Sequence, residues 1–253
     1  MSLPEIASRP TRLRRVARDG APDREAVLIH GFGADMGVWL MTEPALARYA
    51  RLTLYDLPGH GGTGLELARG DLPEFSDHLA ALLDAQGLAR PHLIAHSFGA
   101  AVALHLAATR PGRVSGLSLI APAGLGAAVD PAFLRDLPAA QTPESMRAVL
   151  GRMLARPERM TPAMATDVLA ALNRPGAREA LRRVAALIPT LNATLAPLLP
   201  ALDLPVQVLR GAADAIIPDA PLPFTVEVIP GAGHLPQLEA PAAVNAALAA
   251  HLA

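Results

Sequence analysis

The sequence predicts an α/β fold in which a mostly parallel sheet is covered by helices on both faces. Two observations carry this prediction. Short apolar runs alternate along the chain with longer stretches of helical periodicity, which is the pattern of repeated strand–helix units. The runs are largely continuous rather than alternating, as expected of strands that are buried on both faces. With 253 residues, 51% of them hydrophobic, the chain is long enough for one such domain with a large core.

Seven runs are predicted as strands. The first, residues 11–16, alternates arginine with apolar residues, which indicates an edge strand with a charged outer face. The others are mainly apolar and lie at residues 26–29, 51–55, 92–95, 114–120, 206–209 and 225–229. Functional sites of parallel sheets lie at the carboxyl ends of the strands, so the residues that follow these runs are the first candidates for chemistry.

Helical patterns fill several of the intervals between the strands. Residues 72–86 precede Gly87, which is suited to cap a helix, and residues 98–109 end just before Pro111. A last helix is expected at about residues 237–251.

Residues 127–200 break the alternation of strands and helices. They contain no convincing strand, and prolines punctuate three helical segments near residues 143–154, 162–172 and 177–187. We interpret this segment as a helical cap over the carboxyl ends of the strands. The α/β core then consists of residues 1–126 and 201–253.

The connection between the last two predicted strands is short for a parallel crossover, which usually needs a helix. It contains Pro218, Pro221 and Pro223, so we expect no helix there. The sheet would then be uncovered near this edge, and an uncovered apolar face favours a partner. We therefore expect a homodimer through this region.

Composition excludes several functional classes. The 22 basic and 23 acidic residues give a formal net charge of -1, so charge predicts neither nucleic acid nor a membrane surface as a partner. The sequence has no cysteine and no lysine, which excludes thiolate metal sites, a cysteine nucleophile, a Schiff base and a lipoyl-lysine. No group of His, Asp and Glu has metal-ligand spacing, so we expect neither a metal nor a cofactor. The absence of a signal peptide and of an apolar stretch of ~18 residues leads us to expect a cytoplasmic protein.

Ser97 is the strongest candidate for chemistry. It stands between a predicted strand and a predicted helix in Ala95-His96-Ser97-Phe98-Gly99, with small residues two positions to either side. This is the pattern of a nucleophile elbow, a tight turn in which only small flanking residues fit. The first small position holds alanine where glycine is usual, a departure that keeps the same steric logic.

A serine nucleophile needs a base, and the base needs a carboxylate that fixes its tautomer. His234 follows the last predicted strand, and Asp214 follows the strand before it, so both lie at the correct end of the sheet. The chain order Ser97, Asp214, His234 is the one expected of this kind of hydrolase. Asp219 is an alternative to Asp214, whereas Asp203 precedes its strand and lies at the wrong end.

The chain resembles the α/β-hydrolase fold superfamily over nearly its whole length. Five motifs carry the resemblance in the expected order, namely His30-Gly31-Phe32-Gly33, Asp56-Leu57-Pro58-Gly59-His60-Gly61, Ala95-His96-Ser97-Phe98-Gly99, the Asp214 segment and Gly231-Ala232-Gly233-His234. Within the superfamily, residues 119–126 and the cap look most like two groups. One is the hydrolase-fold domain of acetoin dehydrogenase acyltransferase subunits, and the other is the meta-cleavage-product hydrolases, which cut carbon–carbon bonds.

The resemblance implies an oxyanion hole made by the backbone N–H groups of Phe32 and Phe98, which would meet the charge that develops on a carbonyl oxygen. It also implies that His30 supports the oxyanion loop rather than acting as a base. The candidate substrate contacts are His30, Gly31, His96, Met146, Met153 and Leu235. The methionines of the cap would make a pliable apolar pocket.

We predict a serine hydrolase that cleaves a carboxylic ester or similar acyl bond of an apolar small molecule. Two alternatives stay open. A carbon–carbon bond hydrolase of a diketone-like substrate ranks lower, because such relatives have a cap Arg where this chain has Val168 and a Trp after the histidine where it has Leu235. An acetoin-dehydrogenase-related accessory or binding protein is the other, without lipoyl acyltransferase activity, because the sequence contains no lysine to carry a lipoyl group.

Overall fold

The computed structural model describes residues 3–252, and it has the predicted α/β architecture. A seven-stranded sheet runs in the order β3-β5-β4-β6-β7-β8-β9. Its strands are β3 (Leu13–Val16), β4 (Glu25–Ile29), β5 (Arg51–Tyr55), β6 (His92–His96), β7 (Gly116–Ile120), β8 (Val206–Gly211) and β9 (Val226–Ile229). Only β3 at one edge is antiparallel, pairing with β5, while the other neighbouring strands run parallel.

Helices cover both faces of the sheet. Val27 and Ile29 of β4 belong to one apolar cluster, with α2 (Leu72–Ala85) and α3 (Phe98–Thr109). Ala26 and Leu28, the alternate residues of the same strand, belong to a second cluster with α1 (Glu43–Leu46) and α10 (Pro241–Leu252). Side chains alternate across a strand, so the two clusters are two cores on opposite faces. This explains why the central strands are continuously apolar.

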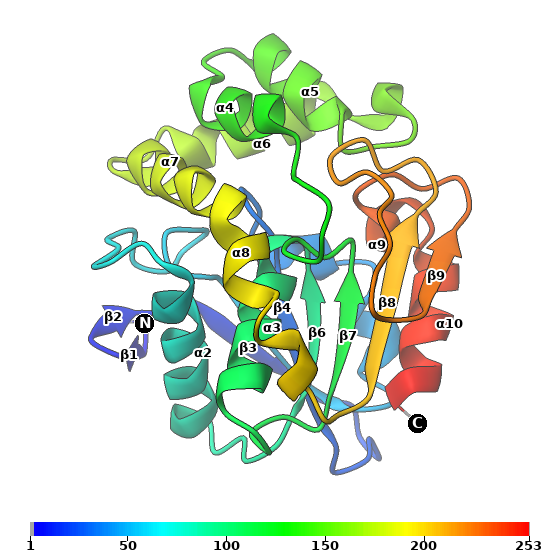
Figure 1. Cartoon of the computed structure of the whole chain (residues 1–253). Helices are drawn as coiled ribbons and strands as arrows, with labels where there is room; N and C mark the ends of the chain where they lie inside the picture. The colour runs from blue at the N-terminus through cyan, green and yellow to red at the C-terminus, as the bar shows by residue number, and fades with distance from the viewer. Residues whose placement is uncertain (1–2, 253) are drawn as a thin grey trace.

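The long segment between β7 and β8 lies at the carboxyl end of the sheet. Figure 1 shows α4 to α7 above the arrowheads of β6 and β7, and α8 descending beside α3. The helices are α4 (Pro131–Ala139), α5 (Pro143–Gly151), α6 (Pro162–Leu172), α7 (Ala177–Leu187) and α8 (Leu191–Leu195). Proline stands in the first turn of α4, α5 and α6, where its missing N–H would be unpaired anyway.

Several elements differ from the sequence prediction. The hairpin of β1 (Glu5–Ile6) and β2 (Arg9–Pro10) and the helix α4 were not predicted. The expected last helix is two helices, α9 (Pro236–Glu239) and α10, because Pro241 forces Ala240 into a non-helical conformation. Short 3₁₀ turns are too brief to leave a periodic pattern in the sequence. They occur at Met36–Trp39, Pro157–Arg159, Ile188–Thr190 and Leu199–Ala201.

The connection between β8 and β9 contains no helix, as predicted. Val228 of β9, the strand at this edge of the sheet, is 46% exposed. The homodimer itself stays a prediction. Of the helices between residues 3 and 252, none combines the length and the apolar character that crossing a membrane requires.

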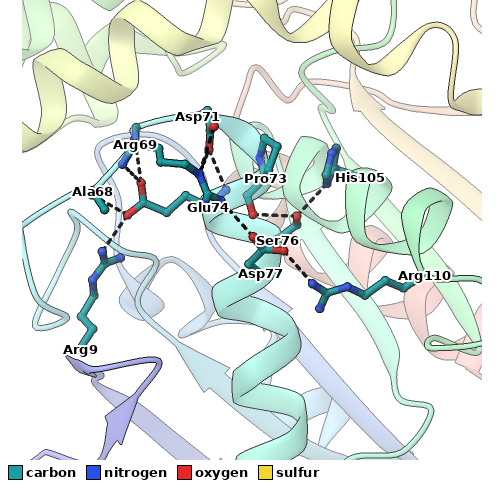
Figure 2. Close-up of polar contacts among 11 residues, drawn as sticks. Arg9, Ala68, Arg69, Asp71, Pro73, Glu74, Ser76, Asp77, His105 and Arg110 are labelled. Carbon is teal, nitrogen blue, oxygen red and sulfur yellow. Dashed lines mark hydrogen bonds and ion pairs between the residues drawn. The ribbon is translucent and has the colours of Figure 1, made fainter.

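A buried carboxylate fixes the loop that precedes α2. Glu74 accepts hydrogen bonds from the backbone N–H groups of Ala68, Arg69 and Gly70, at 2.7–2.9 Å, and from the Arg9 guanidinium at 2.8 Å (Figure 2). The same loop contacts α7, because Arg183 donates to the Leu67 carbonyl. Glu74 thus orders the loop on which α7 packs at the carboxyl end of the sheet.

Candidate active site

Ser97 lies on a strained turn between β6 and α3. Its φ is 51° and its ψ is -117°, a left-handed conformation that costs energy for a residue with a side chain. The turn brings α3 so close to β4 that a Cβ on Gly99 would lie 2.3 Å from the carbonyl oxygen of His30. Glycine is therefore required at this position, which gives the small-residue pattern of the elbow its steric reason.

Two hydrogen bonds connect Ser97, His234 and Asp214. The distance between Ser97 Oγ and His234 Nε2 is 3.0 Å, and that between His234 Nδ1 and Asp214 Oδ2 is 2.9 Å. The side chains of His234 and Asp214 are each 2% exposed. The structure thus brings together three residues that are widely separated in sequence, each at the carboxyl end of a different strand.

The environment of Asp214 keeps it ionised. Burial by itself raises the pKa of Asp214, but the hydrogen bond from His234 and those from the N–H groups of Ile216 and Ile217 outweigh it, so the net shift is downward. A carboxylate can only accept, so His234 Nδ1–H is the donor to Asp214. The lone pair of His234 is then on Nε2, where it accepts the hydroxyl proton of Ser97.

The two other aspartates considered as partners of His234 lie elsewhere. Asp219 is exposed and forms an ion pair with Arg210. Asp203 is exposed and precedes β8, at the amino end of that strand.

His30 is fully buried, and both of its ring nitrogens bond to the backbone. Nδ1–H donates to the Gly31 carbonyl at 2.8 Å, and Nε2 accepts from the Leu57 N–H at 2.9 Å. Burial lowers the pKa of His30 to about 4, so the ring is neutral as this pattern requires. His30 therefore joins the loops that follow β4 and β5. Neither nitrogen remains for a substrate, which corrects its prediction as a substrate contact and agrees with its predicted support of the loop.

His96 bonds to the backbone of His234 instead of reaching the open side of the elbow. Its Nε2–H donates to the His234 carbonyl at 2.8 Å, and the two rings lie 4.9 Å apart. Burial lowers the pKa of His96 to about 3, so its ring is also neutral. The position of His96 points to a role in holding His234 rather than in binding substrate.

The backbone near Ser97 provides two candidate donors for an oxyanion. Phe98 is the first residue of α3, and an N–H at this position has no acceptor within its own helix. The loop that contains Phe32 packs directly on the serine, because a Cβ on Gly31 would lie 2.9 Å from the Cβ of Ser97. At Gly31 the backbone of this loop therefore comes close to Ser97, and a side chain would not fit there. The Phe32 ring packs against Phe133 of α4, with centroids 6.1 Å apart.

The three apolar residues predicted as substrate contacts lie in the core cluster that contains Phe32. Met146, Met153 and Leu235 are buried, with exposed fractions of at most 7%, in the same cluster as Phe32 and Phe133. Met153 touches His234 directly, since its carbonyl accepts the His234 N–H at 2.7 Å. Ser97 itself is 6% exposed. Ser97 is thus almost fully buried, and apolar residues of the segment 127–200 belong to the same core cluster as Phe32.

Sequence reasoning missed Glu239 at the end of α9. Its carboxylate accepts hydrogen bonds from the N–H groups of Gly233 and Ala155. A glutamate beyond the histidine motif carries no local signal of this role, because one partner lies 84 residues away. Within residues 3–252, no three His, Cys, Asp or Glu side chains gather in a way that could hold a metal ion.

Comparison with known proteins identifies the family of the chain. Residues 26–247 match the family described as the alpha/beta hydrolase family. The chain belongs to the alpha/beta hydrolase family. The dihydrolipoyllysine-residue acetyltransferase component of the acetoin cleaving system of Pseudomonas putida is 40% identical over 231 residues. These residues are 89% of this chain but only 62% of that protein, so the chain spans less than two thirds of this relative.

Two further similar proteins align with this chain over most of the length of both proteins. Pimeloyl-(acyl-carrier protein) methyl ester esterase of Chromobacterium violaceum is 32% identical over 226 residues, which are 82% of this chain and 83% of that protein. The structure of the meta-cleavage product hydrolase CumD of Pseudomonas fluorescens IP01 aligns with a TM-score of 0.86 and 21% identity. It covers 98% of this chain and 96% of that chain, and at this identity it shows a shared fold.

Proposed function

We propose that this chain is a serine hydrolase that cleaves a carboxylic ester or a related acyl bond of an apolar small molecule. The observation that carries the proposal is the pair of hydrogen bonds that link Ser97 to His234 and His234 to Asp214. A carboxylate that fixes the tautomer of a histidine, and a histidine that accepts the proton of a strained serine, are the requirements of nucleophilic acyl chemistry.

The reaction follows from the positions of these groups. Ser97 Oγ attacks the carbonyl carbon of the substrate while its proton moves to His234 Nε2. Asp214 stabilises the resulting imidazolium, and the N–H groups of Phe32 and Phe98 bind the oxyanion, each worth about 3 kcal/mol. His234 then gives the proton to the leaving alcohol, and an acyl group remains on Ser97. Water, activated by His234, releases the acid and restores the hydroxyl of Ser97.

We infer that residues 127–200 act as a cap that selects the substrate. Met146 and Met153 come from this segment, and Leu235 follows the histidine. All three are buried in one apolar cluster. Flexible thioethers suit an apolar group of variable shape. An apolar acyl group suits these surroundings, and the esterase of Chromobacterium violaceum supports the choice of an ester as the scissile bond.

A second candidate is a role beside the acetoin-cleaving machinery, and the 40% identity to a component of that system favours it. The given sequence has no lysine, so it cannot carry the lipoyl group itself. In this alternative the site would bind an acyl-bearing partner without turning over esters. Carbon–carbon bond hydrolysis by the same Ser97 is the remaining alternative.

The test is hydrolysis of p-nitrophenyl esters of graded chain length, measured for the wild type, Ser97→Ala and Ser115→Ala. Ser115 lies before β7 at the opposite end of the sheet and serves as the matched control. Turnover by the wild type and the control, reduced by about 10⁴-fold or more in Ser97→Ala, supports the proposal. Turnover that survives in Ser97→Ala, or no turnover of any ester by the wild type, contradicts it.

A further inference from the structure

The backbone of His234 is held from two sides. Its N–H donates to the Met153 carbonyl at 2.7 Å, and its C=O accepts from His96 Nε2–H at 2.8 Å. His96 belongs to the elbow of Ser97, whereas Met153 belongs to the segment 127–200. The proposed base therefore depends on a contact with the segment between β7 and β8 as well as on the elbow.

Glu239 joins these two pieces of chain through one carboxylate. Oε2 accepts from the Gly233 N–H at 2.6 Å, and Oε1 accepts from the Ala155 N–H at 2.9 Å. Hydrogen bonds to an ionised acceptor are stronger than those between neutral groups. Gly233 directly precedes His234, and Ala155 lies two residues after Met153, so the carboxylate bridges both sides of the contact at His234.

The two backbones meet without a side chain between them. A Cβ on Gly233 would lie 2.6 Å from the Met153 carbonyl oxygen and 2.7 Å from the Ala155 nitrogen. Glycine is thus required beside the histidine, because any side chain there would push residues 153–155 away. With the glycine in place, two hydrogen bonds cross the contact, one from the His234 N–H to the Met153 carbonyl and one from the Ala155 N–H to Glu239. The bond from the Gly233 N–H fixes Glu239 within the loop of the histidine.

We propose that Glu239 is a positioning residue that holds His234 in line with Ser97 by clamping its loop to residues 153–155. The inference rests on the proposed function of His234 as the base. Glu239 does not touch Ser97 and takes no proton in the reaction. It acts through the backbone of Gly233, and it makes the placement of the base depend on the position of residues 153–155.

The test compares Glu239→Gln with Glu227→Gln, which makes the same chemical change at an exposed position of β9. An amide keeps one acceptor oxygen but replaces the other by NH₂, so the N–H of either Gly233 or Ala155 loses its partner. We expect kcat for a p-nitrophenyl ester to fall by about 10–100-fold in Glu239→Gln with little change in KM, since small displacements of a catalytic group cost rates of this order. Glu227→Gln should match the wild type.

A double-mutant cycle with His234→Ala separates positioning from a general loss of stability. If Glu239 acts through His234, adding Glu239→Gln to His234→Ala leaves the residual rate unchanged. An equal fold-loss in both backgrounds, or a kcat of Glu239→Gln equal to that of the wild type, overturns the proposal.

Amide hydrogen exchange gives a readout that does not need turnover. We expect the Gly233 and Ala155 amides to exchange faster in Glu239→Gln than in the wild type, while those of the central strands stay protected. Unchanged exchange at both amides overturns the clamp even if the enzyme is active. If the wild type hydrolyses no ester, the proposed function fails, and the exchange measurement alone still decides whether Glu239 holds this contact.

Discussion

His234 and Asp214 are joined by a hydrogen bond of 2.9 Å between Nδ1 and Oδ2, although they come from separate loops after β9 and β8. The second oxygen of Asp214 accepts two backbone N–H groups. The carboxylate is therefore fixed in orientation as well as in charge, and the tautomer of His234 follows from it.

Replacing Asp214 by asparagine should remove this control of the tautomer. The amide can donate to Nδ1, which would place the ring proton on Nε2 and prevent that atom from accepting the proton of Ser97. We expect ester hydrolysis to fall by about 10⁴-fold, with folding retained. Asp219→Asn, which changes an exposed aspartate on the same connection, is the control and should keep full activity. An Asp214→Asn variant that is as active as this control would show that Asp214 does not orient the base.

The elbow predicts a large penalty for a side chain at Gly99. A methyl group at this position would collide with the backbone oxygens of His30 and Ile29 at 2.3 and 2.8 Å. We expect Gly99→Ala to lower the free energy of unfolding by at least about 3 kcal/mol. Overpacking and backbone strain are among the causes of the largest destabilising effects of single mutations. Gly87→Ala is the comparison, since Gly87 has a positive φ but open space around it, and its cost should be about 1–2 kcal/mol. Equal thermal shifts in the two variants would contradict the close approach of α3 and β4.

Glu74 predicts a pH-dependent contribution to stability. Burial alone raises its pKa, but the hydrogen bond from Arg9 and the three backbone N–H donors lower the pKa of Glu74 from 4.5 to about 2. Because the folded value is the lower one, the stabilising effect is complete above about pH 4.5 and is lost as the pH falls toward 2.

Glu74→Gln should therefore lower the free energy of unfolding by on the order of 2 kcal/mol at pH 7. The gap to the wild type should close between about pH 4.5 and pH 2. Thermal melts at a series of pH values measure it, with Glu66→Gln as the control on the exposed part of the same loop. A gap that stays constant over this range would show that the ionised carboxylate does not stabilise the loop.

β9 is an edge strand with no helix in the connection that precedes it, and this predicts self-association. Val228 is exposed on this strand, and the connection before it contains no covering helix. We expect light scattering to give the mass of a homodimer and Val228→Arg to shift it toward the monomer. A wild type that is monomeric at the working concentration would remove the reason for this proposal.

The sequence predicts the sheet, and it predicts that Ser97, His234 and Asp214 lie at the same end of it, where the structure brings them together. Continuous apolar runs indicated the central strands, and the small residues around Ser97 indicated the elbow. Chain order then selected His234 and Asp214, although the sequence alone kept Asp219 as an alternative. The choice of Asp214 over Asp219 depends on which carboxylate faces His234, and that is a property of the folded loop.

The elements that were missed depend on contacts between distant parts of the chain. The hairpin of β1 and β2 has two residues in each strand, too few for a periodic signal, and Arg9 is tied to Glu74 in α2. The role of Glu239 requires Ala155 to come close, and no pattern within α9 shows this. The motif around His30 makes it a candidate substrate contact, but the acceptor role of its Nε2 is visible only when the folded chain brings the Leu57 N–H beside it.

The most direct test of the central claim, that Ser97 is an activated nucleophile, is covalent labelling with a fluorophosphonate followed by peptide mass spectrometry. We predict one adduct per chain, located on Ser97, and its loss in Ser97→Ala and in His234→Ala. Labelling of another residue, or no labelling of a folded wild-type protein, would contradict the account.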